Sequence, residues 1–270
     1  MKNFMLIAVA AVVILGGAAY YYWQRLQSTP APVSLSAPGL TPPPAPRAAP
    51  PPPAHQVVEA PPAPTPLPQL GESDSFTLNA LAGLIGDKSL MNLFHTEHVI
   101  HKIVATIDNL PRQRVALSVL PVVPVPDGFI PAQSNTALTI SPANAPRYAP
   151  YVKIAEAIDA KKLVGLYIRL YPLFQRSYEE LGYPKKYFND RVIETLDDLL
   201  AAPDLKEPVQ LVQPHVFYLY ADPDLEARSA GQKILMRIGS GNEAKIKEKL
   251  KEIKQELTLH MHAEKVGTDQ

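Results

Sequence analysis

The sequence predicts a mainly α-helical protein in three parts: an N-terminal transmembrane helix over residues 1–26, a disordered proline-rich linker over 27–71, and a helical domain with a short β-hairpin over 72–270. Three observations predict this layout. Residues 4–23 form an uncharged and largely apolar run, and 16 of the 30 prolines fall between Pro30 and Pro68. After these prolines, apolar residues recur at the spacing of three to four that is typical of packed helices.

The apolar run FMLIAVAAVVILGGAAYYYW, residues 4–23, is long enough to cross a bilayer. A helix of this length covers about 30 Å, which is the thickness of the hydrocarbon core. Its aromatic end, Tyr20 to Trp23, fits the membrane–water interface. A cleaved signal peptide is the alternative, because Gly17-Ala18-Ala19 offers small residues at a cleavage site. The positive charge of Lys2 favours an N-terminus inside, so in a bacterium we expect a single-pass inner-membrane protein whose C-terminal domain is periplasmic.

The proline-rich linker should be stiff. Proline fixes its own φ near −65° and biases the preceding residue towards extended backbone, so this segment is expected to be polyproline II. At about 3.1 Å per residue, its reach is at most roughly 140 Å. It would therefore hold the helical domain off the membrane. A docking motif for an aromatic groove is the alternative, because Pro43-x-x-Pro46 satisfies the minimal pattern.

Charge and cysteine content exclude several classes of protein. Lys plus Arg and Asp plus Glu number 26 each, so no net field attracts nucleic acid. The chain has no cysteine, which excludes disulfide scaffolds, thiol catalysis and metal sites ligated by cysteine.

The first half of the helical domain should contain four helices. The expected ranges are 74–85, 89–109, 148–158 and 160–181. The last of these carries a wide stripe of large apolar residues, which predicts a central buried helix that ends at Gly182. Prolines interrupt residues 115–141, so loops or edge strands are expected there.

The second half should contain a hairpin between helices. We expect a helix from Asn189 or Asp190 to Pro203, strands over 209–212 and 216–220, and a helix over 229–238. Ser240 and Glu243 form a capping box for a terminal helix. Because that helix offers only four regularly spaced apolar contacts, packing against the domain is expected rather than a coiled coil.

Five segments of the domain resemble the hallmark segments of a bacterial family. They are KIVATIDNLPR (102–112), RYAPYV (147–152), LYIRLYPLFQRSYEELGYP (166–184), VQLVQPHVFYLYADPDLE (209–226) and GQKILMRIGSGNEAKIKEKL (231–250). The family is the domain of unknown function family 3014. The resemblance implies a membrane-anchored protein with this three-part layout, and it implies no activity.

The sequence shows no catalytic motif, and neither a cofactor nor a bound metal is expected. His95, His98 and His101 are spaced by three, which fans their imidazoles about 60° apart around a helix. They are therefore expected to be surface or partly buried histidines rather than ligands of one ion. Gly239-x-Gly241 follows a helix instead of a strand, which argues against a phosphate-binding loop.

Tyrosine is the most unusual local feature. Seven of the nine tyrosines in the domain lie within residues 148–187, interleaved with arginines. Tyrosine suits both half-buried cores and recognition surfaces, so a core and a groove for a peptide or glycan both remain open. The candidate binding residues are Arg147, Tyr148, Tyr167 and Arg169, followed by Glu226, Lys233 and Arg237.

These features favour an interaction or scaffold module of the cell envelope over an enzyme. Its expected partners are the membrane, through a single span, and an envelope protein or a cell-wall component. The alternative is an envelope hydrolase or a glycan-binding protein whose site assembles only in the fold.

Overall fold

The computed structural model describes residues 66–134, 137–205 and 208–267. The expected span over 4–23 and almost all of the proline-rich linker lie outside these ranges. Within the described ranges, no helix has both the length and the apolar character that a membrane span requires.

The described part is mainly helical, as predicted, and it contains two short antiparallel hairpins. The α-helices are α2 (Asp74–Ile85), α3 (Val99–Asn109), α4 (Asn144–Ala157), α5 (Ala160–Glu180), α6 (Phe188–Leu200), α7 (Pro223–Glu226), α8 (Ala230–Arg237) and α9 (Ser240–Gly267). The 3-10 helices are η1 (Leu70–Glu72), η2 (Lys88–Leu93) and η3 (Leu117–Val119). Strand β1 (Pro131–Gln133) pairs with β2 (Leu138–Ile140), and β3 (Leu211–Val212) pairs with β4 (Leu219–Tyr220).

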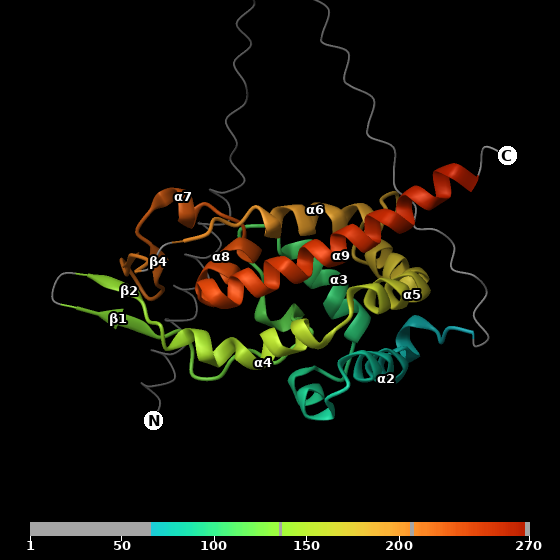
Figure 1. Cartoon of the computed structure of the whole chain (residues 1–270), viewed down its shortest axis with the longest axis horizontal. Coiled ribbons are helices and arrows are strands. Elements are labelled where there is room, and N and C mark those ends of the chain that lie inside the picture. The colour runs from blue at the N-terminus through green and yellow to red at the C-terminus, as the bar shows by residue number, and fades with distance from the viewer. Residues whose placement is uncertain (1–65, 135–136, 206–207, 268–270) are drawn as a thin grey trace, which may run out of the picture. The chain divides into compact units, whose positions relative to one another are not determined.

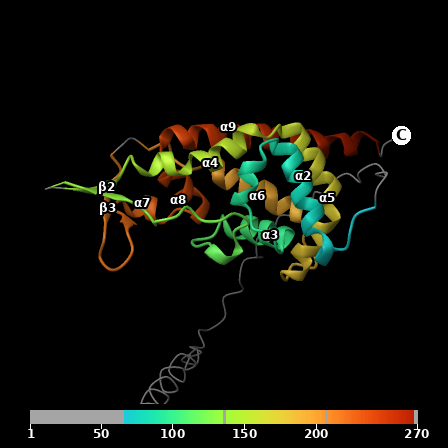
Figure 2. The same cartoon turned by 90° about the horizontal axis from the view of Figure 1, so that it is seen from below.

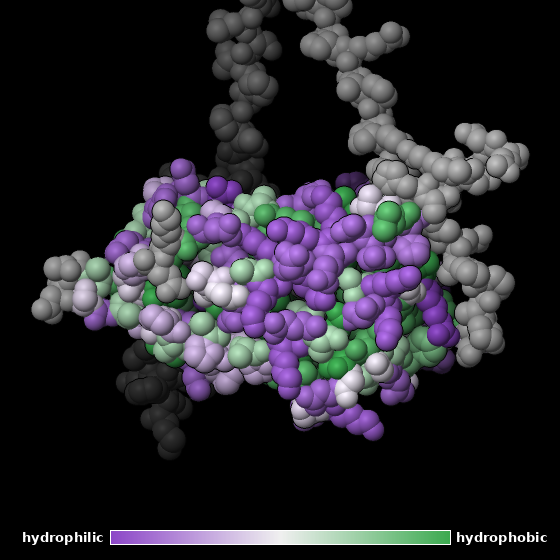
Figure 3. All heavy atoms as spheres, in the orientation of Figure 1, coloured by the Kyte–Doolittle hydropathy of each residue, from purple (hydrophilic) through white to green (hydrophobic). Residues whose placement is uncertain are grey.

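The long terminal helix α9 crosses α4, α5 and α6 and packs against all three (Figure 1). This confirms the expectation that it packs on the domain. Its other faces carry charged residues, and hydrophilic side chains cover much of the corresponding surface in Figure 3.

The two hairpins lie together at one end of the helices, while α2 and the end of α5 lie at the other (Figures 1 and 2). Strands β2 and β3 are neighbours there, and Thr139 and Gln210 form a bridge between them.

Helix α5 is the central buried helix that its apolar stripe predicts. Its buried residues include Leu170, Leu173, Phe174 and Tyr178. Phe174 stacks on Phe188 of α6 with ring centroids 5.7 Å apart. Leu67 and Leu70 pack against the same cluster, so these two residues belong to the helical domain although they precede its expected start.

The expected helix over 89–109 is wrong in its first half. Hydrogen bonds from residues far away in the sequence hold the backbone there in other conformations. The Asp74 carboxylate accepts hydrogen bonds from the backbone N–H groups of His98 and Val99, each at 2.8 Å, and these fix the start of α3. His98 takes a left-handed conformation with φ 56°. Before it, Phe94 bridges to Val122 in an extended conformation.

The three histidines consequently do not share a helix. His95 precedes α3, His98 is its N-cap, and only His101 lies within it. The His101 Nε2 atom is 3.2 Å from a carboxylate oxygen of Glu180.

Other contacts also replace two expected helix caps, one of them tertiary and one within the helix. Helix α6 begins at Phe188, so Asn189 lies inside it, and its buried amide oxygen accepts a hydrogen bond of 3.3 Å from the Tyr167 hydroxyl. The Glu243 carboxylate is buried and pairs with Lys247 of the next turn at 2.9 Å. Local cap signals are weak when a buried partner competes for the same side chain.

Gly239 joins α8 to α9 and needs the conformational freedom of glycine. Its φ is +91°, and a Cβ atom added there would lie 2.9 Å from the Cβ of Ala145 in α4. A left-handed backbone costs a residue with a side chain roughly 1–2 kcal/mol, before any steric clash is counted.

We predict that Gly239→Ala lowers the free energy of unfolding by about 2 kcal/mol, measured by urea unfolding followed with circular dichroism. Gly165→Ala is the matched control, because Gly165 lies within α5 and an added Cβ there meets nothing within 4 Å. It should raise the free energy of unfolding by about 1 kcal/mol. Equal effects of the two changes would contradict the role given to Gly239.

Candidate functional site

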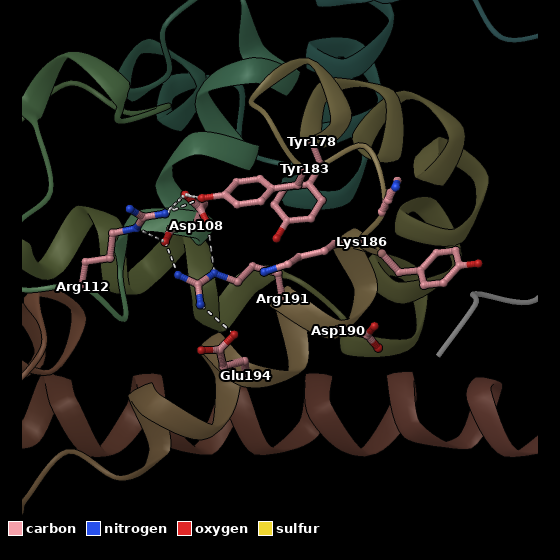
Figure 4. Close-up of a pocket in the computed structure, with 10 residues that line it drawn as sticks. Asp108, Arg112, Tyr178, Tyr183, Lys186, Asp190, Arg191 and Glu194 are labelled. Carbon is pink, nitrogen blue, oxygen red and sulfur yellow. Dashed lines mark hydrogen bonds and ion pairs between the residues drawn. The ribbon is translucent and has the colours of Figure 1, made fainter. Parts of the chain in front are cut away.

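A pocket of about 310 Å³ opens between the end of α3, the loop over residues 181–187 and the first turns of α6 (Figure 4). Its lining consists of four basic, three acidic and three tyrosine side chains. Charge and aromatic rings therefore dominate its walls.

The Asp108 carboxylate, which is buried, lies at the centre of this pocket's wall. One of its oxygens is 2.6 Å from Nη2 of Arg112, and the other is 3.1 Å from Nε of Arg191. The backbone carbonyl of Asp108 accepts a further hydrogen bond from each arginine. Both guanidinium groups are thus held on one residue, as Figure 4 shows.

Arg191 is nearly buried and links two carboxylates. Its Nη1 atom is 2.7 Å from Glu194, whose side chain is 62% exposed. Its Nε atom faces Asp108 at ion-pair distance without hydrogen-bond geometry. All three nitrogens of this guanidinium are therefore turned towards protein oxygens.

Tyr183 closes the pocket from the loop side. Its hydroxyl accepts a hydrogen bond of 2.6 Å from Arg112 and lies 3.4 Å from Asp108. Its ring stacks on Tyr178 at 4.6 Å, and Lys186 lies over it at 5.5 Å from the centroid. The bond to Tyr183, followed by the charge of Asp108, raises the pKa of Arg112, so this side chain stays cationic.

The electrostatics of the pocket suit recognition better than proton transfer. Burial raises the pKa of Tyr178 to about 12, so its hydroxyl stays protonated near neutral pH. Asp108 already faces two arginines. The pocket therefore presents fixed charges and aromatic rings to a ligand.

A second feature is the tip of the β3–β4 hairpin, which we define as Val216 and Phe217. The two side chains are 79% and 78% exposed. The loop that carries them projects from the body beside β3 in Figure 2.

The base of this hairpin brings together three of the sequence-predicted candidates. Glu226 accepts a hydrogen bond of 2.9 Å from the backbone N–H of Tyr220, and Lys233 lies 3.1 Å from the same carboxylate. The Arg237 guanidinium lies over the rings of Tyr220 and Phe129, at 5.4 and 5.9 Å. These three side chains thus surround Tyr220 at the base of the hairpin.

The other four candidates divide between two regions. Arg147 donates to Asn144 at 3.2 Å and to the carbonyl of Pro126, and Tyr148 packs against the cluster of Ala202, Leu235 and Ile238. Tyr167 packs in the α5 core, and the Arg169 guanidinium lies over the Phe76 ring at 5.1 Å. The two pairs belong to different packing clusters, and their role in binding stays a prediction.

Sequence reasoning missed both the pocket and the hairpin tip. Asp108 and Arg112 are four residues apart at the end of a helix, which is a recognisable ion-pair spacing. Arg191 is far away in the sequence, and nothing local connects it with Asp108. Val216 and Phe217 were expected inside a strand, where their exposure could not be foreseen.

Comparison with known proteins gives one finding. A family model described as "Protein of unknown function (DUF3014)" matches residues 99–254. No curated protein and no solved structure matches the chain. The matched range runs from the start of α3 into α9, so it contains both the pocket and the hairpin tip.

We predict that Asp108→Ala lowers the free energy of unfolding by about 3–5 kcal/mol, because it leaves the nearly buried Arg191 without its main partner. Glu194→Ala removes the exposed partner of the same arginine and should cost about 0–1 kcal/mol. Urea unfolding of both variants checks the difference. A small effect of Asp108→Ala would show that the pair does not hold α3 to α6.

Proposed function

The chain belongs to the DUF3014 family, whose description assigns no activity, and we propose that it is a membrane-anchored interaction module of the bacterial cell envelope. The apolar run over 4–23 supports a single span in the inner membrane, and the proline-rich linker supports a domain held away from it in the periplasm. The described part supplies the surface that meets the partner.

The hairpin tip is the observation that carries this proposal. Scattered exposed apolar residues are normal on protein surfaces, but Val216 and Phe217 are adjacent and nearly fully exposed on a projecting loop. Burying such side chains contributes about 1.5–3 kcal/mol each. A partner that covers the tip gains this free energy, and an aromatic anchor in a pocket is a common centre of binding energy.

The hairpin is prepared for binding because its base is fixed. Glu226, Lys233 and Arg237 hold Tyr220, which is buried and also donates a hydrogen bond of 3.2 Å to the carbonyl of Lys233. A fixed base reduces the conformational entropy that binding would otherwise cost. Residues 211–220 contain no Asp, Glu, Lys or Arg, so the matching surface is an uncharged, apolar pocket on a protein partner.

Two observations favour this binding role over the alternatives of an envelope hydrolase and a glycan groove. The shifted tyrosines, such as Tyr171 and Tyr178, have raised pKa values through burial, and hydrogen bonds lower the pKa values of Asp87 and Asp204. These groups are therefore held in their resting forms near neutral pH. Tyr167 packs against Phe174 in the core cluster of α5, which makes it a core residue rather than the wall of a groove.

The topology can be tested with reporters fused after Gln270. We predict that a reporter active only in the periplasm works there, because the apolar run with Lys2 inside places the C-terminus outside. The mature protein should also keep residues 1–23. A cytoplasmic reporter that works at this position would overturn the orientation, and a mature N-terminus near Tyr20 would show cleavage.

The hairpin tip can be tested by replacing Phe217 with a photo-crosslinking benzophenone amino acid in the full chain. We predict one discrete protein adduct after irradiation of intact cells, and a lower yield when Val216→Asp is added. The yield should fall because a carboxylate at the tip must be desolvated when the partner binds.

Leu117, which is 66% exposed on η3, is the matched site for the same photo-crosslinker. An identical adduct pattern at both sites, or an adduct with lipid alone at 217, would contradict a protein partner at the tip.

A further inference from the structure

We propose that the pocket between α3, the loop over 181–187 and α6 binds a single carboxylate group of a small ligand. This site is separate from the hairpin tip and does not depend on the function proposed for it. The inference is carried by uncommitted hydrogen-bond donors, by their fixed positions and by the charge of the lining.

Arg112 has a hydrogen-bond donor that its protein partners do not use. Its hydrogen bonds to Asp108 and Tyr183 use Nε and Nη2 only, and within the described ranges Nη1 has no partner. The side chain is 48% exposed, whereas Arg191 is nearly buried and faces protein oxygens through all its nitrogens. Arg112, which lines the pocket, therefore keeps one guanidinium nitrogen, Nη1, for a ligand.

Two lysines add further donors at the same opening. Lys185 and Lys186 are exposed and line the pocket, and among the described residues neither ammonium group is hydrogen-bonded. Lys186 lies over the ring of Tyr183, whose hydroxyl accepts the hydrogen bond from Arg112 (Figure 4). Arg112 and Lys186 thus both contact Tyr183, and Lys185 lines the same pocket.

The scaffold behind these donors is already in place. The Gln175 amide donates to the carbonyl of Lys186 at 2.9 Å and accepts from the backbone N–H of Phe188 at 2.8 Å. Asp108 and Tyr183 fix the guanidinium of Arg112 from the other side. A ligand therefore does not have to order the loop or the arginine, which lowers the cost of binding.

The charge of the lining selects the type of anion. Four basic residues (Arg112, Lys185, Lys186, Arg191) minus three acidic ones (Asp108, Asp190, Glu194) leave one positive charge. One carboxylate neutralises it. A phosphate monoester carries nearly two charges and would be repelled by Asp190 and Glu194. The free nitrogen of Arg112 and the two ammonium groups can each donate a charge-assisted hydrogen bond to a carboxylate.

The volume of about 310 Å³ leaves room for a ligand of modest size, near the lower end of known ligand pockets. The tyrosine rings offer an apolar wall to whatever carries the carboxylate. Both a short peptide with a free C-terminus and an acidic sugar meet these requirements, and matched probes distinguish them.

The test is isothermal titration calorimetry on the full chain in detergent micelles. The probes are N-acetyl-Ala-Ala and its C-terminal amide, glucuronate and glucose, and inorganic phosphate. We expect at least one carboxylate to bind, its uncharged counterpart to give no heat, and phosphate to bind more weakly. Lys185→Ala with Lys186→Ala should lower the affinity about tenfold or more, because two charge-assisted contacts are lost.

Lys161→Ala with Lys162→Ala is the matched control, because it removes an exposed lysine pair at the start of α5, away from the pocket. It should leave the affinity unchanged. The proposal is overturned if neither carboxylate binds, if acid and uncharged probe bind equally, if phosphate binds more tightly, or if both lysine pairs have the same effect. Both lysine pairs are exposed, so their replacement tests binding without disturbing the fold.

Discussion

The last turn of α3 organises the described part of the chain, because its backbone carbonyl groups need partners from outside the helix. A helix leaves its final four carbonyls without internal hydrogen bonds. Here the carbonyl of Ile107 accepts from Thr195 at 3.0 Å, and that of Asp108 accepts from Arg191. Just beyond, the carbonyls of Leu110 and Arg112 accept from the backbone N–H groups at the start of α8, at 2.8 and 2.6 Å. The end of one helix thus fixes the positions of two others.

This arrangement explains why Gly231 occupies the start of α8. A Cβ atom at this position would lie 2.5 Å from the side chain of Leu199 and 3.3 Å from Leu110. A side chain there would force Leu199 and Leu110 to shift, so glycine lets α8 lie close to both while its backbone N–H bonds to Leu110. Asp108 and Arg112 of the charged pocket lie at the same end of α3, so α8 and the pocket share this region of the fold.

The sequence predicts the elements that depend on local patterns and misses those that depend on distant partners. The apolar stripe of α5 and the terminal helix α9 are correct because their periodicity is strong and their packing simply follows it. The helix expected over 89–109 fails because Asp74, far along the chain, caps α3 at His98. The candidate site residues show the same dependence on sequence distance. Glu226, Lys233 and Arg237 are close in sequence and do meet, whereas Arg191 reaches Asp108 only through the fold.

The order of α5, α6 and α9 along the chain has a consequence for biosynthesis. Leu257 of α9 is buried against Val164, Ile168 and Leu196, so α5 and α6 keep an uncovered apolar strip until the last helix arrives. A nascent chain cannot complete this core before the residues up to Leu257 have been made. Products truncated ahead of α9 would carry that strip exposed, which marks them for chaperones and proteases. Helix α9 therefore acts as a check, because a chain that lacks it leaves this core incomplete.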